Sequence, residues 1–237
     1  MSVSNGVKSS CEILNIATLT THFTFDNGLF VNNSGPNSLS ARTQSTESIP
    51  LGRYGQGIRF NGSISSYFQA SGLTNLGMPN KSFSISLWLR PSNLSGVVVH
   101  VSAQPSGFQG WAVPFLIFAG NGSLVSVLYN GNSHGIIIDP ALSVSTSVWS
   151  HVVQTWSPTN GVRLYINNVL LASRLSLAMT YGGNGASMYV TLGNALNATG
   201  VLWMPYANTS PYSGDMDDFR VYSRELSSAD ICTLYTN

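Results

Sequence analysis

Alternation of apolar and polar residues at every second position is the feature that most limits what this chain can fold into. The stretch SFSISLWLR (82–90) places Phe83, Ile85, Leu87 and Leu89 on one face and serines on the other, which predicts a half-buried β-strand. Other stretches are equally rich in β-branched and aromatic residues: 123–129, 149–156, 162–166, 169–173 and 188–193. We therefore expect a chain built almost entirely from strands.

Turn residues separate these strands at short intervals. TNG (159–161) and NN (167–168) supply residues that tolerate positive φ, so 149–173 is predicted to form three strands joined by two tight hairpins. Only one helix is expected: Ser227 is its N-cap and Asp230 the third helical residue, a capping box that begins about two turns. Strands without intervening helices predict an antiparallel β-sandwich or barrel.

Composition limits the partners of this fold. Only 8% of residues are charged and the formal net charge is +1, which argues against nucleic acid and against an anionic membrane surface. Apolar stretches are too short for a membrane-spanning helix, which needs about 20 residues, so no membrane insertion is expected. We expect one domain over residues 1–237, with 1–10 as a flexible lead, and no secretory signal within the chain.

Five stretches, in order, carry a resemblance to a known family: HFTFDNGLFVNNSGPN (22–37), GQGIRFNGSISSYFQAS (55–71), FSISLWLRP (83–91), WSHVVQTWSPTNGVRLYINNVLLAS (149–173) and GDMDDFRVYSRELSSADI (214–231). They resemble the laminin-G-like jelly-roll domains of the concanavalin A-like lectin/glucanase superfamily. The resemblance implies an all-β fold: an antiparallel β-sandwich of two curved sheets with one short C-terminal helix. In many members a concave face meets carbohydrate, but one sandwich supports many functions.

Catalytic chemistry is not expected. Hydrolases of the superfamily place two glutamates around an aspartate on one strand, because acid and nucleophile flank one glycosidic bond. The glutamates here are Glu12, Glu47 and Glu225, and none lies two or four residues from another. No G-x-S-x-G elbow is present, and the four histidines lack zinc-ligand spacing.

Three acidic residues within GDMDDFRVY, namely Asp215, Asp217 and Asp218, suggest an ion site. The segment resembles a strand of related glucanases in which the aspartate aligned with Asp217 binds structural calcium together with the N-terminal opening, here around Asp26. Calcium prefers hard oxygen ligands of this kind. Alternatively, Asp217 caps backbone amides while Asp215 and Asp218 are solvated. Period two predicts Asp217 and Asp218 on opposite faces.

Two features bear on the compartment. Cys11 and Cys232 are either a disulfide or two reduced, buried thiols. The small number of cysteines and the Ser/Asn/Thr-rich composition favour the disulfide and an oxidising environment outside the cell. The resemblance adds that the N-terminal strand and the segment after the last strand lie side by side. Seven N-x-S/T sequons, a mild excess over chance, predict glycosylation candidates at Asn32, Asn61, Asn80, Asn93, Asn121, Asn197 and Asn208.

The segment 194–214 is the candidate ligand site. It is long, shows no alternation, and carries Trp203 and Tyr206, whose ring faces are suited to stacking on a sugar. The alternatives are that it plugs one end of the sandwich, which is the plainer interpretation, or that it forms a protein interface. We expect a non-catalytic extracellular or cell-surface binding or adhesion module whose partner is a neutral glycan or an extracellular protein. The alternative is a structural or assembly unit that forms homo-oligomers and has no glycan ligand.

Overall fold

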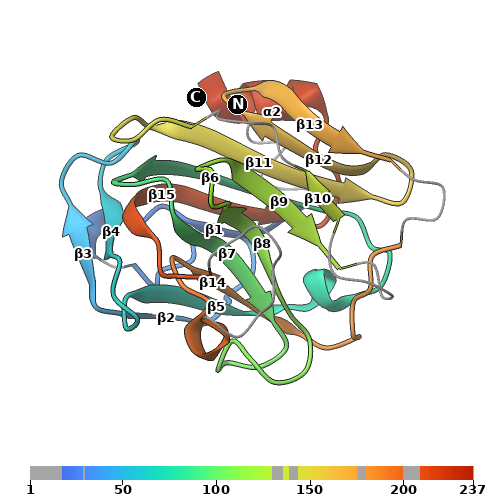
Figure 1. The fold of residues 1–237 in the computed structure, drawn as a ribbon, viewed down its shortest axis with the longest axis horizontal. Coiled ribbons are helices and arrows are strands. Elements are labelled where there is room, and N and C mark those ends of the chain that lie inside the picture. Colours follow the sequence, from blue (N-terminus) through green and yellow to red (C-terminus); the bar gives the residue numbers. More distant parts are fainter. Residues whose placement is uncertain are drawn as a thin grey trace, which may run out of the picture.

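The computed structural model describes residues 18–28, 30–129, 136–138, 144–175, 180–199 and 209–236, with only the backbone of 136–138. Within these ranges the strands form two antiparallel sheets that pack face to face (Figure 1). One short helix, α2 (Ser228–Thr236), follows the last strand. The expected β-sandwich with a C-terminal helix is therefore confirmed.

Sheet A contains eight of the described strands in the order β13-β12-β11-β6-β15-β4-β3, with β1 pairing β15 from the side. Their bounds are β1 (Leu19–Phe23), β3 (Thr46–Ile49), β4 (Gly57–Asn61), β6 (Phe83–Pro91), β11 (Ser150–Ser157), β12 (Gly161–Ile166), β13 (Val169–Arg174) and β15 (Ser213–Tyr222). A short 3-10 helix, η1 (Asp26–Gly28), follows β1. Strands from both ends of the chain thus pair within this sheet.

Sheet B contains seven described strands in the order β10-β9-β8-β7-β14-β5-β2. Their bounds are β2 (Ala41–Gln44), β5 (Tyr67–Leu73), β7 (Gly96–Ser102), β8 (Ala112–Phe118), β9 (Leu124–Leu128), β10 (Ile136–Ile138) and β14 (Met188–Leu192). Two 3-10 helices, η2 (Thr74–Gly77) and η3 (Leu196–Ala198), follow β5 and β14. The central strands β7 and β14 are covered on their inner face by sheet A.

The main core lies between the sheets and is built from the residues that alternation placed inward. On β6, Phe83, Ile85, Leu87 and Leu89 are fully buried in this core, as the sequence predicted. Phe83 stacks on Phe115 from sheet B, with ring centroids 5.5 Å apart. Burying one such side chain contributes roughly 1.5–3 kcal/mol. The apolar faces of both sheets therefore account for the layered fold.

A second, smaller apolar cluster holds α2 against the outer face of sheet A. Ile231 and Leu234 of α2 pack with Tyr222 and Val153. The predicted capping box is confirmed, because Ser227 Oγ accepts the Asp230 N–H and Asp230 Oδ2 accepts the Ser227 N–H. The two hairpins predicted in 149–173 are present as β11, β12 and β13, with Asn167 and Asn168 at positive φ.

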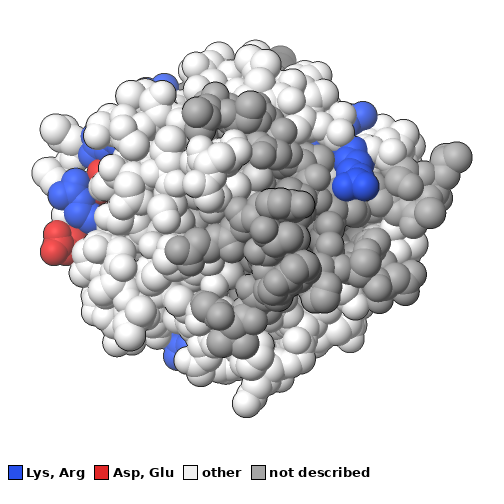
Figure 2. Space-filling view, viewed as in Figure 1, with Lys and Arg blue, Asp and Glu red and all other residues white. Residues whose placement is uncertain are grey.

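Charged side chains are scarce on the described surface as well as in the sequence. Figure 2 shows one face on which nearly all described atoms belong to uncharged residues, with a small group of both charges at the edge where β3 and β4 lie and separate basic side chains elsewhere near the rim. No helix within the described ranges is long and apolar enough to cross a membrane.

Candidate functional site

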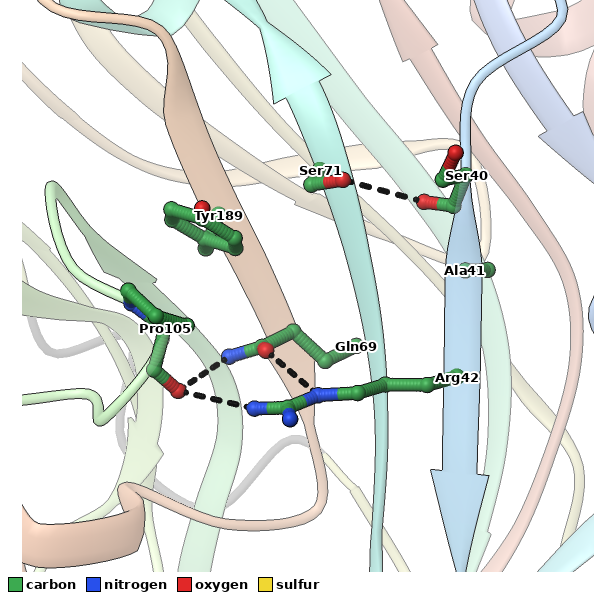
Figure 3. Close-up of a pocket in the computed structure, with 7 residues that line it drawn as sticks. All are labelled: Ser40, Ala41, Arg42, Gln69, Ser71, Pro105 and Tyr189. Carbon is green, nitrogen blue, oxygen red and sulfur yellow. Dashed lines mark hydrogen bonds between the residues drawn. The ribbon is translucent and has the colours of Figure 1, made fainter.

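A pocket of about 290 Å³ opens on the outer face of sheet B, the face turned away from the core (Figure 3). It lies over three neighbouring strands, β2, β5 and β14, and beside the loop 103–111. The residues that line it are Ser40, Ala41, Arg42, Gln69, Ser71, Pro105 and Tyr189. No motif in the sequence marks any of these residues as part of a site.

Strand register brings the polar side chains of this pocket together. Arg42 on β2 lies opposite Gln69 on β5, and Gln69 lies opposite Thr191 on β14. Tyr189 lies opposite Ser71 in the next outward position. Side chains alternate along each strand, so Ala70, between Gln69 and Ser71, points into the core. Val190, between Tyr189 and Thr191, does the same. Over β2, β5 and β14 the outer face of the sheet thus collects polar groups, while the inner face is apolar.

The loop 103–111 forms one wall of the pocket. The carbonyl oxygen of Pro105 accepts hydrogen bonds from Gln69 Nε2 at 3.1 Å and from Arg42 Nη2 at 3.0 Å. Gln69 Nε2 also donates to Thr191 Oγ1 at 2.9 Å. The buried Gln69 amide therefore fixes the loop to the sheet and leaves Tyr189 and Ser71 beside the opening, as Figure 3 shows.

His100 on β7 lies beneath the same loop and opposite Thr191. Its Nε2 is 2.7 Å from the carbonyl oxygen of Gly107, and the side chain is fully buried. Burial lowers the pKa of this imidazole to about 4, although the Gly107 contact acts in the other direction. Nε2 is therefore the protonated nitrogen that donates to Gly107, and His100 stays neutral at physiological pH.

The two predicted calcium ligands, Asp26 and Asp217, face one loop, 52–56. Asp26 Oδ1 accepts the N–H of Gln56 at 2.8 Å, and Asp217 Oδ2 accepts the N–H of Tyr54 at 2.8 Å. A Cβ built on Gly55 would lie 2.4 Å from Asp26 Oδ1, so the loop approaches the carboxylates closely. Burial raises the pKa of Asp217 to about 7.

These residues fit a cation chemically but also fit the amide-capping alternative. A carboxylate has about four lone-pair sites, so each aspartate keeps acceptor capacity beyond its amide contacts. Within the described ranges no group of three or more His, Cys, Asp or Glu side chains has a metal-binding arrangement. A calcium ion would therefore take many of its ligands from backbone carbonyls, and the site stays a prediction.

The other two acidic residues of the cluster are not solvated, contrary to the alternative considered from the sequence. Asp215 is 4% exposed and contacts Arg59 Nε at 2.7 Å and Arg90 Nη2 at 2.7 Å. Asp218 is 5% exposed, with its Oδ1 2.6 Å from His22 Nε2 and 2.9 Å from Arg220 Nη2. Burial raises the Asp218 pKa, but His22 and Arg220 more than offset it, so the pKa is lowered. Both carboxylates are held in buried ion pairs.

The prediction that Asp217 and Asp218 point to opposite faces is also wrong. The pairing of β15 with β6 shifts register between Asp217 and Arg220, and Asp218 has a φ of 53°. This bulge inserts an extra residue, so the inward positions become Met216 and Phe219. Both aspartates consequently lie on the outer side of the sheet.

The remaining predicted site residues are only partly described. Cys232 is exposed on α2, while Cys11 lies outside the described residues, so the disulfide stays a prediction. Trp203, Tyr206 and Asn208 also lie outside them. Six sequon asparagines are exposed, as glycosylation requires: Asn32, Asn61, Asn80, Asn93, Asn121 and Asn197.

The two stacked antiparallel sheets, with the first and last described strands paired in one of them, define a concanavalin A-like jelly roll. The chain belongs to the Concanavalin A-like lectin/glucanases superfamily, whose model matches residues 61–232. No match was found among curated proteins.

Solved structures share this fold at low sequence identity. Domain 4 of AbnA, a GH43 extracellular arabinanase from Geobacillus stearothermophilus solved in complex with arabinotriose, is 19% identical with a TM-score of 0.60, covering 92% of this chain and 98% of that one. The binding domain of Paraclostridial Mosquitocidal Protein 1 is 16% identical with a TM-score of 0.67, covering 92% and 52%. The binding domain of botulinum neurotoxin DC in complex with SialylT is 15% identical with a TM-score of 0.63, covering 94% and 52%. This chain spans about half the length of the two toxin binding domains.

Proposed function

We propose that this chain is a non-catalytic carbohydrate-binding module that acts outside the cell, and that it binds sugar in the pocket on the outer face of sheet B. The observation that carries the proposal is the position of the Tyr189 ring beside the Ser71 hydroxyl, the Gln69 amide and the Arg42 guanidinium. A sugar ring presents an apolar face and a rim of hydroxyls, and an aromatic ring with nearby polar groups matches both.

Pocket size and chemistry support binding rather than cleavage. The volume of about 290 Å³ lies just below the usual range for ligand pockets, about 300–1,000 Å³, and suits one terminal sugar or a short segment. No carboxylate is among the described residues that line it. Glycoside hydrolysis uses two carboxyl groups that flank the scissile bond, so a binding role agrees better with this lining.

The fold neighbours support the same class of function. Domain 4 of AbnA was solved with arabinotriose, and the botulinum neurotoxin DC binding domain with SialylT. The exposed sequon asparagines, and the description of AbnA as an extracellular enzyme, support a location outside the cell. For binding in a single small pocket, we expect an affinity between about millimolar and micromolar.

The test is a glycan array followed by titration calorimetry with the best ligand. Tyr189→Ala should abolish measurable binding, and Tyr189→Phe should retain most of it because the ring remains. Leu51→Ala, which changes an exposed apolar residue that does not line the pocket, is the control. Trp203→Ala tests the site expected from the sequence. If this variant loses binding and Tyr189→Ala does not, the ligand binds at the 194–214 segment and not in the sheet B pocket.

An assembly unit is the second candidate function, favoured by one observation. The edge strand β13 exposes Val169, Leu170 and Leu171, with 55%, 46% and 39% of each residue accessible. An apolar edge strand offers free hydrogen-bonding groups to a second copy of the chain. Sedimentation should then show concentration-dependent oligomers that Leu170→Lys disperses. A monomer at all concentrations would remove this candidate.

A further inference from the structure

We infer that the ligand of the sheet B pocket is an acidic sugar, and that Arg42 binds its carboxylate. The inference rests on the proposed function and narrows it to one class of glycan. The scarcity of charged residues in the sequence predicts a neutral ligand. The structure places Arg42, one of the few positive charges, in the lining of the pocket. For ligand choice this position matters more than the total number of charged residues in the chain.

Arg42 is held in one orientation. Its Nε donates to Gln69 Oε1 at 2.9 Å and its Nη2 donates to the Pro105 carbonyl at 3.0 Å. The guanidinium also lies over the Tyr67 ring, 5.5 Å from the ring centroid. The flexible side chain has therefore lost much of its rotamer freedom before a ligand binds, which reduces the entropy cost of binding.

The held guanidinium retains donors for a ligand. Arginine carries five N–H groups, and the two contacts with Gln69 and Pro105 use one hydrogen each on Nε and Nη2. Both hydrogens of Nη1 and one of Nη2 have no partner among the described residues. Two adjacent guanidinium N–H groups match the two oxygens of a carboxylate.

The charge of Arg42 is also uncompensated by the described part of the chain. Five other arginines have carboxylate partners there: Arg59, Arg90, Arg163, Arg220 and Arg224. The partners of Arg42 are instead a neutral amide oxygen and a backbone carbonyl oxygen. These oxygens orient the guanidinium without neutralising it, so its positive charge is available to an anionic ligand.

The remaining lining groups suit a sugar that carries this carboxylate. Gln69 on β5 lies between Arg42 on the neighbouring strand β2 and the other neighbouring strand, β14, which carries Tyr189 (Figure 3). A uronic or sialic acid has a ring face for Tyr189, hydroxyls for Ser71 and a carboxylate for Arg42. A neutral sugar would leave the guanidinium with water as its only further partner.

The test compares each acid with its own methyl ester, which keeps the shape and removes the charge. A galacturonic acid trimer and sialyllactose are titrated, each as acid and as ester, into wild type, Arg42→Gln and Arg42→Lys. At low salt we expect at least one acid to bind about tenfold or more tightly than its ester, because charge-assisted hydrogen bonds are the stronger ones. Arg42→Gln should reduce acid binding to the level of the ester, and Arg42→Lys should recover only part of the difference.

Arg174→Gln is the matched control. It makes the same change in net charge at an exposed position on β13 of the other sheet. This variant should keep the acid preference, and melting temperature should confirm that every variant is folded. Equal loss in Arg174→Gln and Arg42→Gln would attribute the preference to net charge and overturn the role of Arg42.

Failure of this inference can be told apart from failure of the proposed function. If acids and esters bind equally and Arg42→Gln changes neither, the acidic-sugar inference is overturned, while loss of binding in Tyr189→Ala still supports the pocket. If neither acids, esters nor any array glycan binds, both the inference and the proposed function are overturned.

Discussion

Asp26 and Asp217 stand at opposite ends of the sequence and hold neighbouring backbone amides of one loop, Asp26 that of Gln56 and Asp217 that of Tyr54. The loop 52–56 is therefore fixed to η1 and β15 at the same time. A bond network of this kind links the first described segment of the chain to its last strand. Both carboxylates contact this loop, at Gln56 and at Tyr54, and a shared calcium ion between them stays a prediction.

The first prediction concerns calcium. Added calcium should raise the melting temperature of the protein, because an ion that binds only the folded state stabilises it by about 2.7 kcal/mol at a hundred times its Kd. For a domain of this size the shift is on the order of 5–10 °C. Scanning calorimetry in EDTA and in millimolar calcium measures it.

The calcium effect should disappear in Asp26→Asn and in Asp217→Asn. Glu47→Gln is the control, since this exposed carboxylate does not contact the loop. An unchanged melting temperature in EDTA, with no calcium found by elemental analysis, would leave amide capping as the role of both aspartates.

The second prediction is a loss of stability in acid caused by His100. The folded-state pKa of about 4 lies below the ordinary value of 6.5, so the unfolded chain binds the proton more tightly. The stabilising effect of the neutral imidazole is complete above pH 6.5 and is lost as pH falls from 6.5 to 4. The loss at the acid end is on the order of 3 kcal/mol.

His100→Gln keeps a donor for Gly107 and removes the titration. Urea unfolding at pH 8 and pH 4.5 should give a smaller difference in this variant than in wild type. Other titrating groups, such as the buried His151, contribute to both proteins and cancel in the comparison. Equal pH dependence in the two proteins would mean that His100 is hydrated or protonated in the folded state.

Local sequence patterns predicted most of the fold for a physical reason. A strand buried on one face must alternate, and the alternation in 82–90 identified β6 and its inward residues without any partner strand. The capping box at Ser227 and the asparagines at 167 and 168 act through their own backbone, so they were also found locally. Each of these signals is contained within a few residues.

The pocket could not be predicted in the same way because it depends on pairing between distant strands. Tyr189 lies in a predicted strand, but its position beside Ser71 and near Arg42 follows from the order β14-β5-β2. The bulge at Asp218 was missed for a related reason: a one-residue insertion changes the face of the next residue and leaves no distinct pattern. A predicted strand shows which of its side chains share a face. Only the register between paired strands shows which side chains of different strands meet in a pocket.

The third prediction is covalent. We expect Cys11 and Cys232 to form a disulfide in protein isolated under oxidising conditions, and Cys232 is exposed on α2, where it can react. Such a bond would close most of the chain into one loop and stabilise the fold by about 5 kcal/mol in the loop-entropy model. A thiol assay on oxidised, denatured protein should find no free sulfhydryl. Two reactive thiols would show that both cysteines are reduced.

The fourth prediction concerns Asp215, which joins two arginines. Arg59 and Arg90 each donate two hydrogen bonds to it, and the guanidinium of Arg90 also lies over Trp149. The side chain of Asp215 is only 6% exposed, whereas those of Arg59 and Arg90 are 48% and 27% exposed. Removal of the carboxylate therefore leaves two guanidinium groups close together and only partly able to regain water.

Asp215→Asn should lower the free energy of unfolding by about 2 kcal/mol, a typical cost for losing hydrogen bonds to a charged group. Arg59→Gln should cost less than about 1 kcal/mol, because solvent screens the pair that the half-exposed Arg59 makes and Arg90 still neutralises the carboxylate. Urea unfolding at low and high salt measures both. A cost for Arg59→Gln as large as that for Asp215→Asn would mean that the exposed pair, rather than the buried carboxylate shared by two arginines, holds β4 against β15.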